Sequence, residues 1–203
     1  MFRRDPVAAR QLANSTIEYC RDQRLMFWEA SGYLVDGWAL IQEGKLHEGT
    51  ERMHQGFTIR RAAGAALVHS SFQAVLAECH GLAGEFDIGL TLIEVGLTHA
   101  ERSGERIAES ELYRVRGELL LARSSEANAE IAAQCFERAI TVARQQEAKL
   151  YELRSALSLA RLRRSQGKLK EALDLLAPIY GWFTEGFDTK DLKEAKALLQ
   201  SLR

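Results

Sequence analysis

The 203-residue sequence predicts an all-α fold made of repeated helix pairs. Only two prolines are present, Pro6 and Pro178, both near the ends, and proline inside a helix breaks it. Between short polar segments lie stretches of roughly 15–20 residues with apolar positions at i, i+3, i+4 and i+7, the pattern of amphipathic helices. The turn-like segments recur along the chain: QEGKLHEG at 42–49, LAGEFDIG at 82–89, RSGER at 102–106, RSSEAN at 123–128 and SQGKLKEA at 165–172.

These turns divide one domain, 1–203, into six elements in chain order. Residues 1–21 are expected to form a leading helix. Four helix pairs are expected to follow, each with a turn near its middle, and a capping helix is expected to close the array, because the last repeat has no following neighbour to cover its apolar face. The expected pairs span 22–64, 65–103, 104–146 and 147–186, and the capping helix spans 187–203.

The capping helix is predicted from the closing stretch, where Thr189 or Asp188 is a good N-cap for a helix that starts near Lys190. Its apolar stripe is Leu192, Ala195, Leu198 and Leu199. We expect a cluster of aromatic residues that precedes this helix to pack between it and the last repeat. A ligand pocket is the alternative interpretation of the same rings, which are Tyr180, Trp182, Phe183 and Phe187.

Small residues recur at fixed registers in these helices. A glycine inside a helix costs about 1 kcal/mol relative to alanine, so its repetition indicates close approach of paired helices. One row lies on the first helix of each pair, with spacings of 40, 40 and 43 residues: Gly37, Ala77, Gly117 and Ala160. Two rows seven residues apart lie on the second helices: Gly49, Gly89, Ala132 and Ala172, then Gly56, Gly96, Ala139 and, in the last copy, Ile179.

This small-residue register is typical of tetratricopeptide repeats, with helices about one turn longer than usual because the period is about 40 rather than about 34 residues. The best copy is AAQCFERAI, which contains Ala132, Phe136 and Ala139. HEAT-like repeats match the period but not the register and rank second. The fold class is therefore predicted as about four tetratricopeptide-like hairpins in a right-handed superhelix with a C-terminal capping helix.

Most of the chain also resembles a known family. The segments GERIAESELYRVRGELLLA and AAQCFERAITVARQQEAKLYELRSALSLARLRRSQGKLKEALDLLAPIYGWFTEGFDTKDLKEAKALL resemble the C-terminal region of large bacterial signalling proteins. Those proteins join class III adenylate or guanylate cyclase domains to an AAA/STAND-type ATPase and end in tetratricopeptide-like repeats. FWEASGYLVDGWALIQEGKLHEG and LAECHGLAGEFDIGL match more loosely. The resemblance implies a regulatory repeat module that is cut from, or derived from, such a protein and lacks both catalytic parts.

Composition limits the classes of partner and the cellular compartment that we expect. The net charge is −1 with a pI near 6.5, which gives no overall attraction to nucleic acid or anionic membrane. Three dispersed cysteines without a CxxC pair, Cys20, Cys79 and Cys135, predict reduced thiols in the cytoplasm. No segment approaches the roughly 20 apolar residues of a membrane span, and MFRRDPVAAR lacks the apolar run of a signal peptide.

Catalytic and metal motifs are weak. A phosphate loop needs G-x-x-x-x-G-K-[ST], and the two Gly-Lys pairs, at 44–45 and 167–168, lack both the earlier glycine and the following hydroxyl. His47, Glu51 and His54 share a helix face, but a solvated surface is the favoured interpretation. Cys79 and His80 are adjacent on a helix, so their side chains point in different directions, and ordinary packing is favoured over a thiol activated by a base. We predict a non-enzymatic chain without cofactor or metal.

The favoured function is a protein-interaction module, because repeat arrays present a concave surface built from the first helix of each pair. A protein or peptide segment, or adjacent domains of a parent protein, would bind in this groove. Two alternatives stay open: nucleic-acid binding through the basic run at 149–170, and sensing of a small-molecule effector within the curve of the array. The residues projected toward the groove are Trp38, Gln42, Glu78, Arg114, Glu118, Arg154, Arg161 and Arg164.

Overall fold

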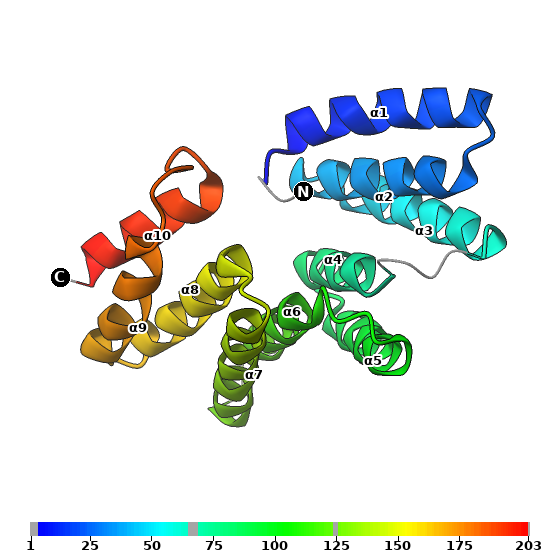
Figure 1. Cartoon of the computed structure of the whole chain (residues 1–203). Helices are drawn as coiled ribbons and strands as arrows, with labels where there is room; N and C mark the ends of the chain where they lie inside the picture. Colours follow the sequence, from blue (N-terminus) through cyan, green and yellow to red (C-terminus); the bar gives the residue numbers. More distant parts are fainter. Residues whose placement is uncertain (1–3, 65–68, 124–125, 203) are drawn as a thin grey trace.

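The computed structural model describes residues 4–64, 69–123 and 126–202, and every regular element in these ranges is an α-helix (Figure 1). The prediction of an all-α protein is confirmed. Parts of two expected elements, residues 65–68 and 124–125, lie outside the described residues, as do the first three residues and the last. The helices are α1 (Pro6–Asp22), α2 (Met26–Gln42), α3 (Leu46–Ala62), α4 (His69–Leu82), α5 (Phe86–Ser103), α6 (Glu109–Ala122), α7 (Glu126–Gln145), α8 (Lys149–Ser165), α9 (Leu169–Gly181) and α10 (Lys190–Ser201).

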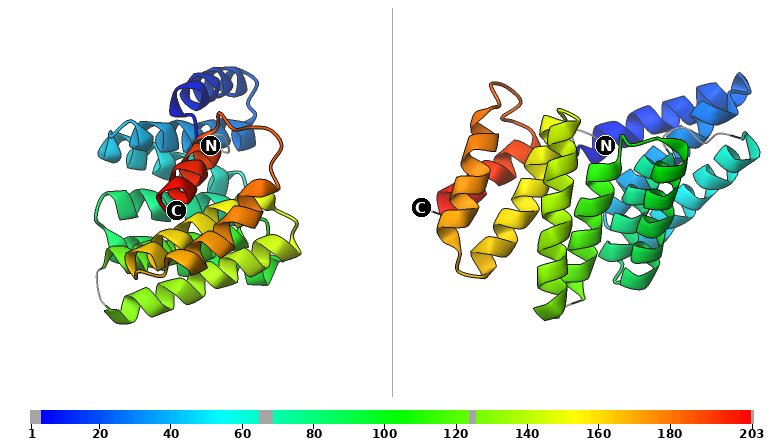
Figure 2. Two further views of the ribbon diagram at one scale, coloured as in Figure 1. Left: turned by 90° about the vertical axis from the view of Figure 1, so that its left-hand side faces the viewer. Right: turned by 60° about the horizontal axis from the view of Figure 1, so that its bottom comes forward.

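The helices stack as successive pairs, α2–α3, α4–α5, α6–α7 and α8–α9, with α1 packed on α2 and α10 packed on α8 and α9 (Figures 1 and 2). The second helix of each pair packs on the first helix of the next pair, and the first helices also contact one another: α4 contacts α2 and α6, and α6 contacts α8. The array therefore has a side formed by α2, α4, α6, α8 and α10, which we call the first-helix side.

Three of the four pairs turn at a glycine. Gly44, Gly84 and Gly167 have φ angles of 85°, 80° and 75°, in the left-handed region that only glycine adopts without strain. At the first of these turns the amide of Lys45 donates to the carbonyl of Leu40 at 2.9 Å, which closes the end of α2 in a Schellman motif. The glycine-led turns recognised in the sequence are thus helix C-terminal caps.

The predicted row of small residues lies at helix crossings. Gly37, Ala77, Gly117 and Ala160 are all buried. A Cβ atom added at Gly37 would stand 2.6 Å from the carbonyl oxygen of Gly49 on the partner helix. One added at Gly117 would stand 2.4 Å from the ring of Phe136 on α7. Close helix approach at this register is confirmed.

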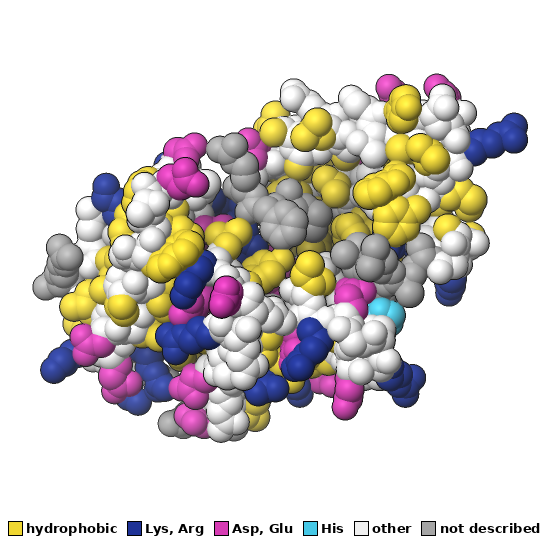
Figure 3. All heavy atoms as spheres, in the orientation of Figure 1, with side chains coloured by type: hydrophobic (Ala, Val, Ile, Leu, Met, Phe, Trp, Pro, Cys, Tyr) yellow, Lys and Arg dark blue, Asp and Glu magenta, His cyan; other side chains and the backbone are white. Residues whose placement is uncertain are grey.

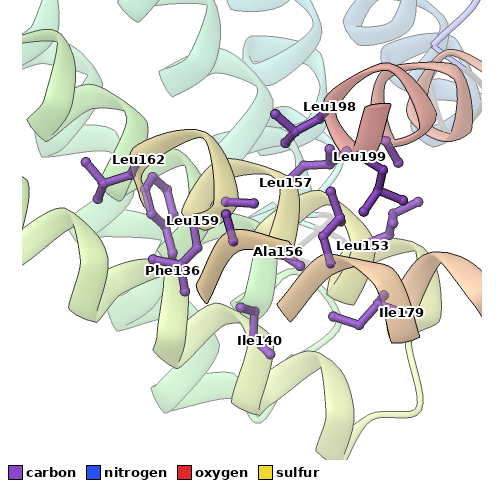
Figure 4. Close-up of a cluster of buried hydrophobic side chains, with 14 of the residues drawn as sticks. Phe136, Ile140, Leu153, Ala156, Leu157, Leu159, Leu162, Ile179, Leu198 and Leu199 are labelled. Carbon is purple, nitrogen blue, oxygen red and sulfur yellow. The ribbon is translucent and has the colours of Figure 1, made fainter. Parts of the chain in front are cut away.

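The largest buried cluster lies at the C-terminal end, where α7, α8, α9 and α10 meet (Figure 4). Leu198 and Leu199 of α10 pack toward Leu153 and Leu157 of α8, while Phe136 and Ile140 close the other side (Figure 4). All four residues of the predicted stripe on the capping helix are buried. The helix covers the last pair as expected.

The packing of the aromatic cluster was predicted wrongly in one respect. Trp182 is 58% exposed, and its ring contacts Phe183 edge to face and the ammonium of Lys149 at 5.7 Å. Phe187 is also exposed, whereas Tyr180 and Phe183 are partly buried against the terminal cluster. Trp182 follows the end of α9 on the outer surface, so leucines of α10, and not this ring, hold the cap.

Within the described residues, no helix combines the length and the apolar character needed to cross a bilayer.

Candidate interaction groove

A cavity of about 670 Å³ opens on the first-helix side of the array, and we call it the groove. All five helices of that side contribute to its wall, so side chains from the start and the end of the chain face the same space. The apolar part of the wall comes mainly from α4, α6 and α8, with Phe72, Val75, Leu119 and Leu157 among its residues. The remaining wall is polar, and most of its residues are charged.

Seven of the eight residues projected toward a groove from the repeat register line this cavity. The exception is Arg164, which does not line the cavity and whose Nη1 donates to the hydroxyl of Ser201 at the end of α10, at 2.9 Å. The seven are Trp38, Gln42, Glu78, Arg114, Glu118, Arg154 and Arg161.

Trp38 is part of the wall rather than a projecting ring. It is 4% exposed and packs with Ala9 of α1 and Ala39 of α2. An indole in this position shapes one end of the groove.

Arg114 lies in the middle of the groove on α6, and three carboxylates surround it. Its Nη2 donates to Glu78 at 3.0 Å and to Glu111 at 3.0 Å, and Glu118 lies 3.9 Å from Nη1. Burial lowers the pKa of Arg114, but Glu111 and Glu78 together raise it well above its ordinary value, so the guanidinium stays charged. The side chains of Glu78 and Glu118 keep 37% and 42% of their surface exposed to solvent.

A second ionic centre joins α8 to α10. Asp191 is 1% exposed and accepts hydrogen bonds from Arg154 at 2.9 and 3.1 Å. Its other oxygen accepts from Arg4 at 3.1 Å, and Arg4 also reaches Glu194 at 3.4 Å. Glu194 in turn pairs with Arg161 at 2.7 Å. These groups tie the capping helix to the wall of the groove.

Five charged residues of this wall were not predicted from the sequence: Arg4, Glu111, Lys190, Asp191 and Glu194. Arg4 lies outside any repeat, so the register could not place it. Asp191 and Glu194 lie on α10, which was treated only as a cap. Their spacing of three residues on one helix face was the available signal, because both point to the same neighbour when that helix packs.

The basic run at 149–170 is largely compensated by acidic neighbours. Lys149 and Arg144 bond Glu152 at 2.8 and 2.7 Å. Arg163 pairs with Glu137 at 3.2 Å. On the face shown in Figure 3, Lys and Arg side chains alternate with Asp and Glu side chains without a patch of one sign. These ion pairs weaken the positive field of the segment, on which nucleic-acid binding would depend.

The side chains of the weaker sequence motifs lie in ordinary packing and hydrogen-bonding environments. Burial raises the pKa of the Cys79 thiol, with Glu78 adding to the effect, so this thiol stays protonated near neutral pH. His80 is buried and its Nδ1 lies 2.6 Å from a carboxylate oxygen of Glu85. In the part of the chain that the structure describes, no three acidic, histidine or cysteine side chains converge as a metal site.

Comparison with known proteins supports the fold. No protein-family model matches the chain, and no curated protein matches it significantly. Among solved structures, a Podosopora anserina putative kinesin light chain with nearly identical TPR-like repeats matches with a TM-score of 0.61. The identity is 16%, over 85% of this chain and 84% of that chain, and a variant of the same protein gives a TM-score of 0.62. The chain therefore has a TPR-like helical repeat fold.

Proposed function

We propose that this chain is a non-catalytic protein-interaction module whose groove binds a segment of mixed charge from a partner protein or a neighbouring domain. The observation that carries the proposal is the groove itself, an indentation with apolar walls and partly exposed charges of both signs. Apolar surface supplies the affinity of such a site, and charge complementarity supplies specificity and rapid association.

Two arginines of one helix provide the test. Arg161 lines the groove with a side chain that is 46% exposed, whereas Arg164, one turn further along α8, lies outside it and is also exposed. Both variants, Arg161→Glu and Arg164→Glu, should keep the fold. The ligands are peptides selected for binding from a random-sequence array. We expect Arg161→Glu to change their affinity by about two- to five-fold, the range of partly exposed ion pairs. Arg164→Glu should leave it unchanged.

The outcome is measured by fluorescence anisotropy with the selected peptides, alongside thermal unfolding of each variant. Equal affinities of wild type and Arg161→Glu, or an equal loss in both variants, would place the interface outside the groove. Charge reversal at Arg114 or Arg154 is a poor test, because both guanidiniums are themselves largely buried and bonded to carboxylates, and their reversal would disturb the fold itself.

A small-molecule effector is the second candidate, favoured by the size of the groove. Ligand sites commonly measure about 300–1,000 Å³ and combine apolar walls with a few placed polar groups, and the groove of about 670 Å³ has both. Thermal-shift screening with a metabolite panel tests this candidate. A hit should lose its effect in Phe72→Ala, since that ring lines the groove at α4.

The resemblance of the segment from Gly104 onward to bacterial cyclase–ATPase signalling proteins supports a place beside such an ATPase, as part of the same polypeptide or as its regulator. Co-expression of the chain with a STAND-type ATPase encoded beside it, followed by affinity capture and ATPase assay, tests this finer proposal. Failure of the two to associate would remove the ATPase as the partner without affecting the groove.

A further inference from the structure

The groove already holds a side chain from elsewhere in the chain. Arg4, which precedes α1, donates to Asp191 at 3.1 Å and to Glu194 at 3.4 Å, carboxylates that lie 187 and 190 residues further along the sequence. Its side chain lines the groove and keeps 30% of its surface exposed. The first described residue of the chain thus contacts the last helix across the groove.

The local backbone aims Arg4 away from α1. Its φ angle is 53°, a conformation that is uncommon for a residue other than glycine and that persists where surrounding contacts determine it. The next residue, Asp5, caps α1 by accepting a hydrogen bond from the amide of Ala8 at 3.1 Å, and Pro6 begins the helix. The chain therefore turns sharply at Arg4, and its guanidinium points into the groove instead of along the helix.

The charge balance of the groove depends on this residue. Five carboxylates and four guanidiniums pair with one another there, and without Arg4 three guanidiniums would remain for five carboxylates. Lys190 adds one exposed ammonium at the rim. The paired groups are Glu78, Glu111, Glu118, Asp191 and Glu194 with Arg4, Arg114, Arg154 and Arg161.

Glu78 shows that Arg4 acts on both sides of the groove. Burial raises the pKa of this carboxyl, but Arg114 and, to a smaller extent, Arg4 and Arg154 lower it below its ordinary value. The field of Arg4 therefore reaches α4 as well as α10. A group that removes Arg4 from this position has to replace its charge, since carboxylates that lose a cation at a partly buried site are destabilised.

We infer that Arg4 is an internal occupant of the groove and that a partner segment displaces it with a basic side chain of its own, placed among Glu78, Asp191 and Glu194. This inference rests on the proposed function, and it specifies the partner as a segment with an arginine or lysine at the α10 end of the groove. Because Arg4 is tethered, its effective concentration is high, and it lowers the apparent affinity of every competitor.

The subsite can be tested without a partner. N-acetyl-arginine amide and N-acetyl-glutamine amide are titrated into wild type and Arg4→Ala, and amide shifts are followed by heteronuclear NMR. We expect the arginine derivative to shift resonances of Glu78 and Glu194 at a concentration about two- to five-fold lower in Arg4→Ala, the range for a partly exposed ion pair. The glutamine derivative should produce no comparable shifts.

Peptides then test the competition itself. Selected array peptides are synthesised with Arg, Lys, Gln or Glu at one position at a time and are measured against wild type, Arg4→Ala and Glu194→Gln. Arg4→Ala should strengthen binding of the basic peptides, and Glu194→Gln should weaken their preference over the Gln peptides. Arg24→Ala is the matched control, because Arg24 is an exposed arginine in the turn after α1, outside the groove.

The outcomes separate the two proposals. Peptide binding at the groove that is insensitive to Arg4 and indifferent to basic residues overturns the displacement inference and leaves the interaction module in place. Binding of the arginine derivative at Glu78 and Glu194, without binding of any array peptide, supports the subsite and counts against the peptide-binding function. Equal shifts by the arginine and glutamine derivatives in Arg4→Ala also overturn the inference.

Discussion

Gly37→Ala provides the sharpest test of close helix packing in the array. Alanine favours a helix over glycine by about 1 kcal/mol, so an open site would gain stability. At Gly37 the new Cβ would stand 2.6 Å from the carbonyl oxygen of Gly49, 2.6 Å from Cγ of Met53 and 2.9 Å from the amide nitrogen of Met53. Two of these atoms belong to the backbone, so α2 and α3 have to separate.

Overpacking costs about 1–3 kcal/mol, and the backbone contacts favour the upper half of that range. After the gain in helix propensity, we expect a net loss of about 1–2 kcal/mol in the free energy of unfolding. For a domain of this size that corresponds to a fall in Tm of about 2–8 °C.

Circular dichroism at 222 nm during heating, together with urea titration, measures this change. Gly181→Ala is the matched control, since Gly181 ends α9 and an added Cβ there has no neighbour within 4 Å. Its Tm should equal or slightly exceed that of the wild type. If Gly37→Ala also equals or exceeds the wild type, the two helices do not approach as closely as the structure shows, and the packing explanation of the small-residue row is wrong.

Three further outcomes are expected from urea unfolding. Trp182→Ala should cost no more than about 1 kcal/mol, as for an exposed cation–π contact; a loss of several kcal/mol would mean that the ring supports the core. Asp191→Ala should cost about 3–5 kcal/mol, because the largely buried Arg154 would lose the carboxylate with which it shares two hydrogen bonds; an unchanged midpoint would contradict this. Burial raises the pKa of Glu152, but hydrogen bonds from basic side chains bring it below its ordinary value of 4.5. Its contribution is therefore complete above about pH 4.5 and is lost as the pH falls through the lower folded-state pKa, so the acid decline should be shallower in Glu152→Gln.

The repeat architecture could be predicted because its signals are local and recur. Gly37 and Gly117 lie inside helices, where glycine is unfavourable, and their spacing of 80 residues matches two periods of the array. A turn glycine such as Gly84 marks a helix end by its left-handed conformation. Both signals can be read along the chain without knowing which distant side chains meet, so composition and spacing are sufficient. Seven of the eight residues projected from the same repeat register line the groove.

The charges of the groove could not be predicted in the same way, since they depend on contacts between distant elements. In the sequence, Arg114 and Arg154 resemble unpaired surface charges. In the structure, Arg114 bonds Glu111 and Arg154 bonds Asp191. The exposure of Trp182 could not be predicted for a related reason. Its large apolar surface favours burial on average, and only the path of the chain after α9 leaves it on the surface.

The polar contacts of the groove also hold the array together. Arg114 bonds Glu78 across 36 residues, and Arg154 bonds Asp191 across 37 residues, so each contact joins the first helix of one unit to the next. Ser158 of α8 donates to Glu118 of α6 across 40 residues in the same manner. These separations are close to the repeat period.

A ligand that takes a carboxylate from one of these contacts therefore loosens the tie between neighbouring first helices, and a change in their spacing alters the groove in return. By linkage, binding in the groove and the curvature of the array are coupled, with equal coupling energy in both directions. Substitutions at Glu78 or Asp191 would change stability and binding together. Only wall residues outside these ties, such as Gln42, can separate a loss of binding from a change in the shape of the array.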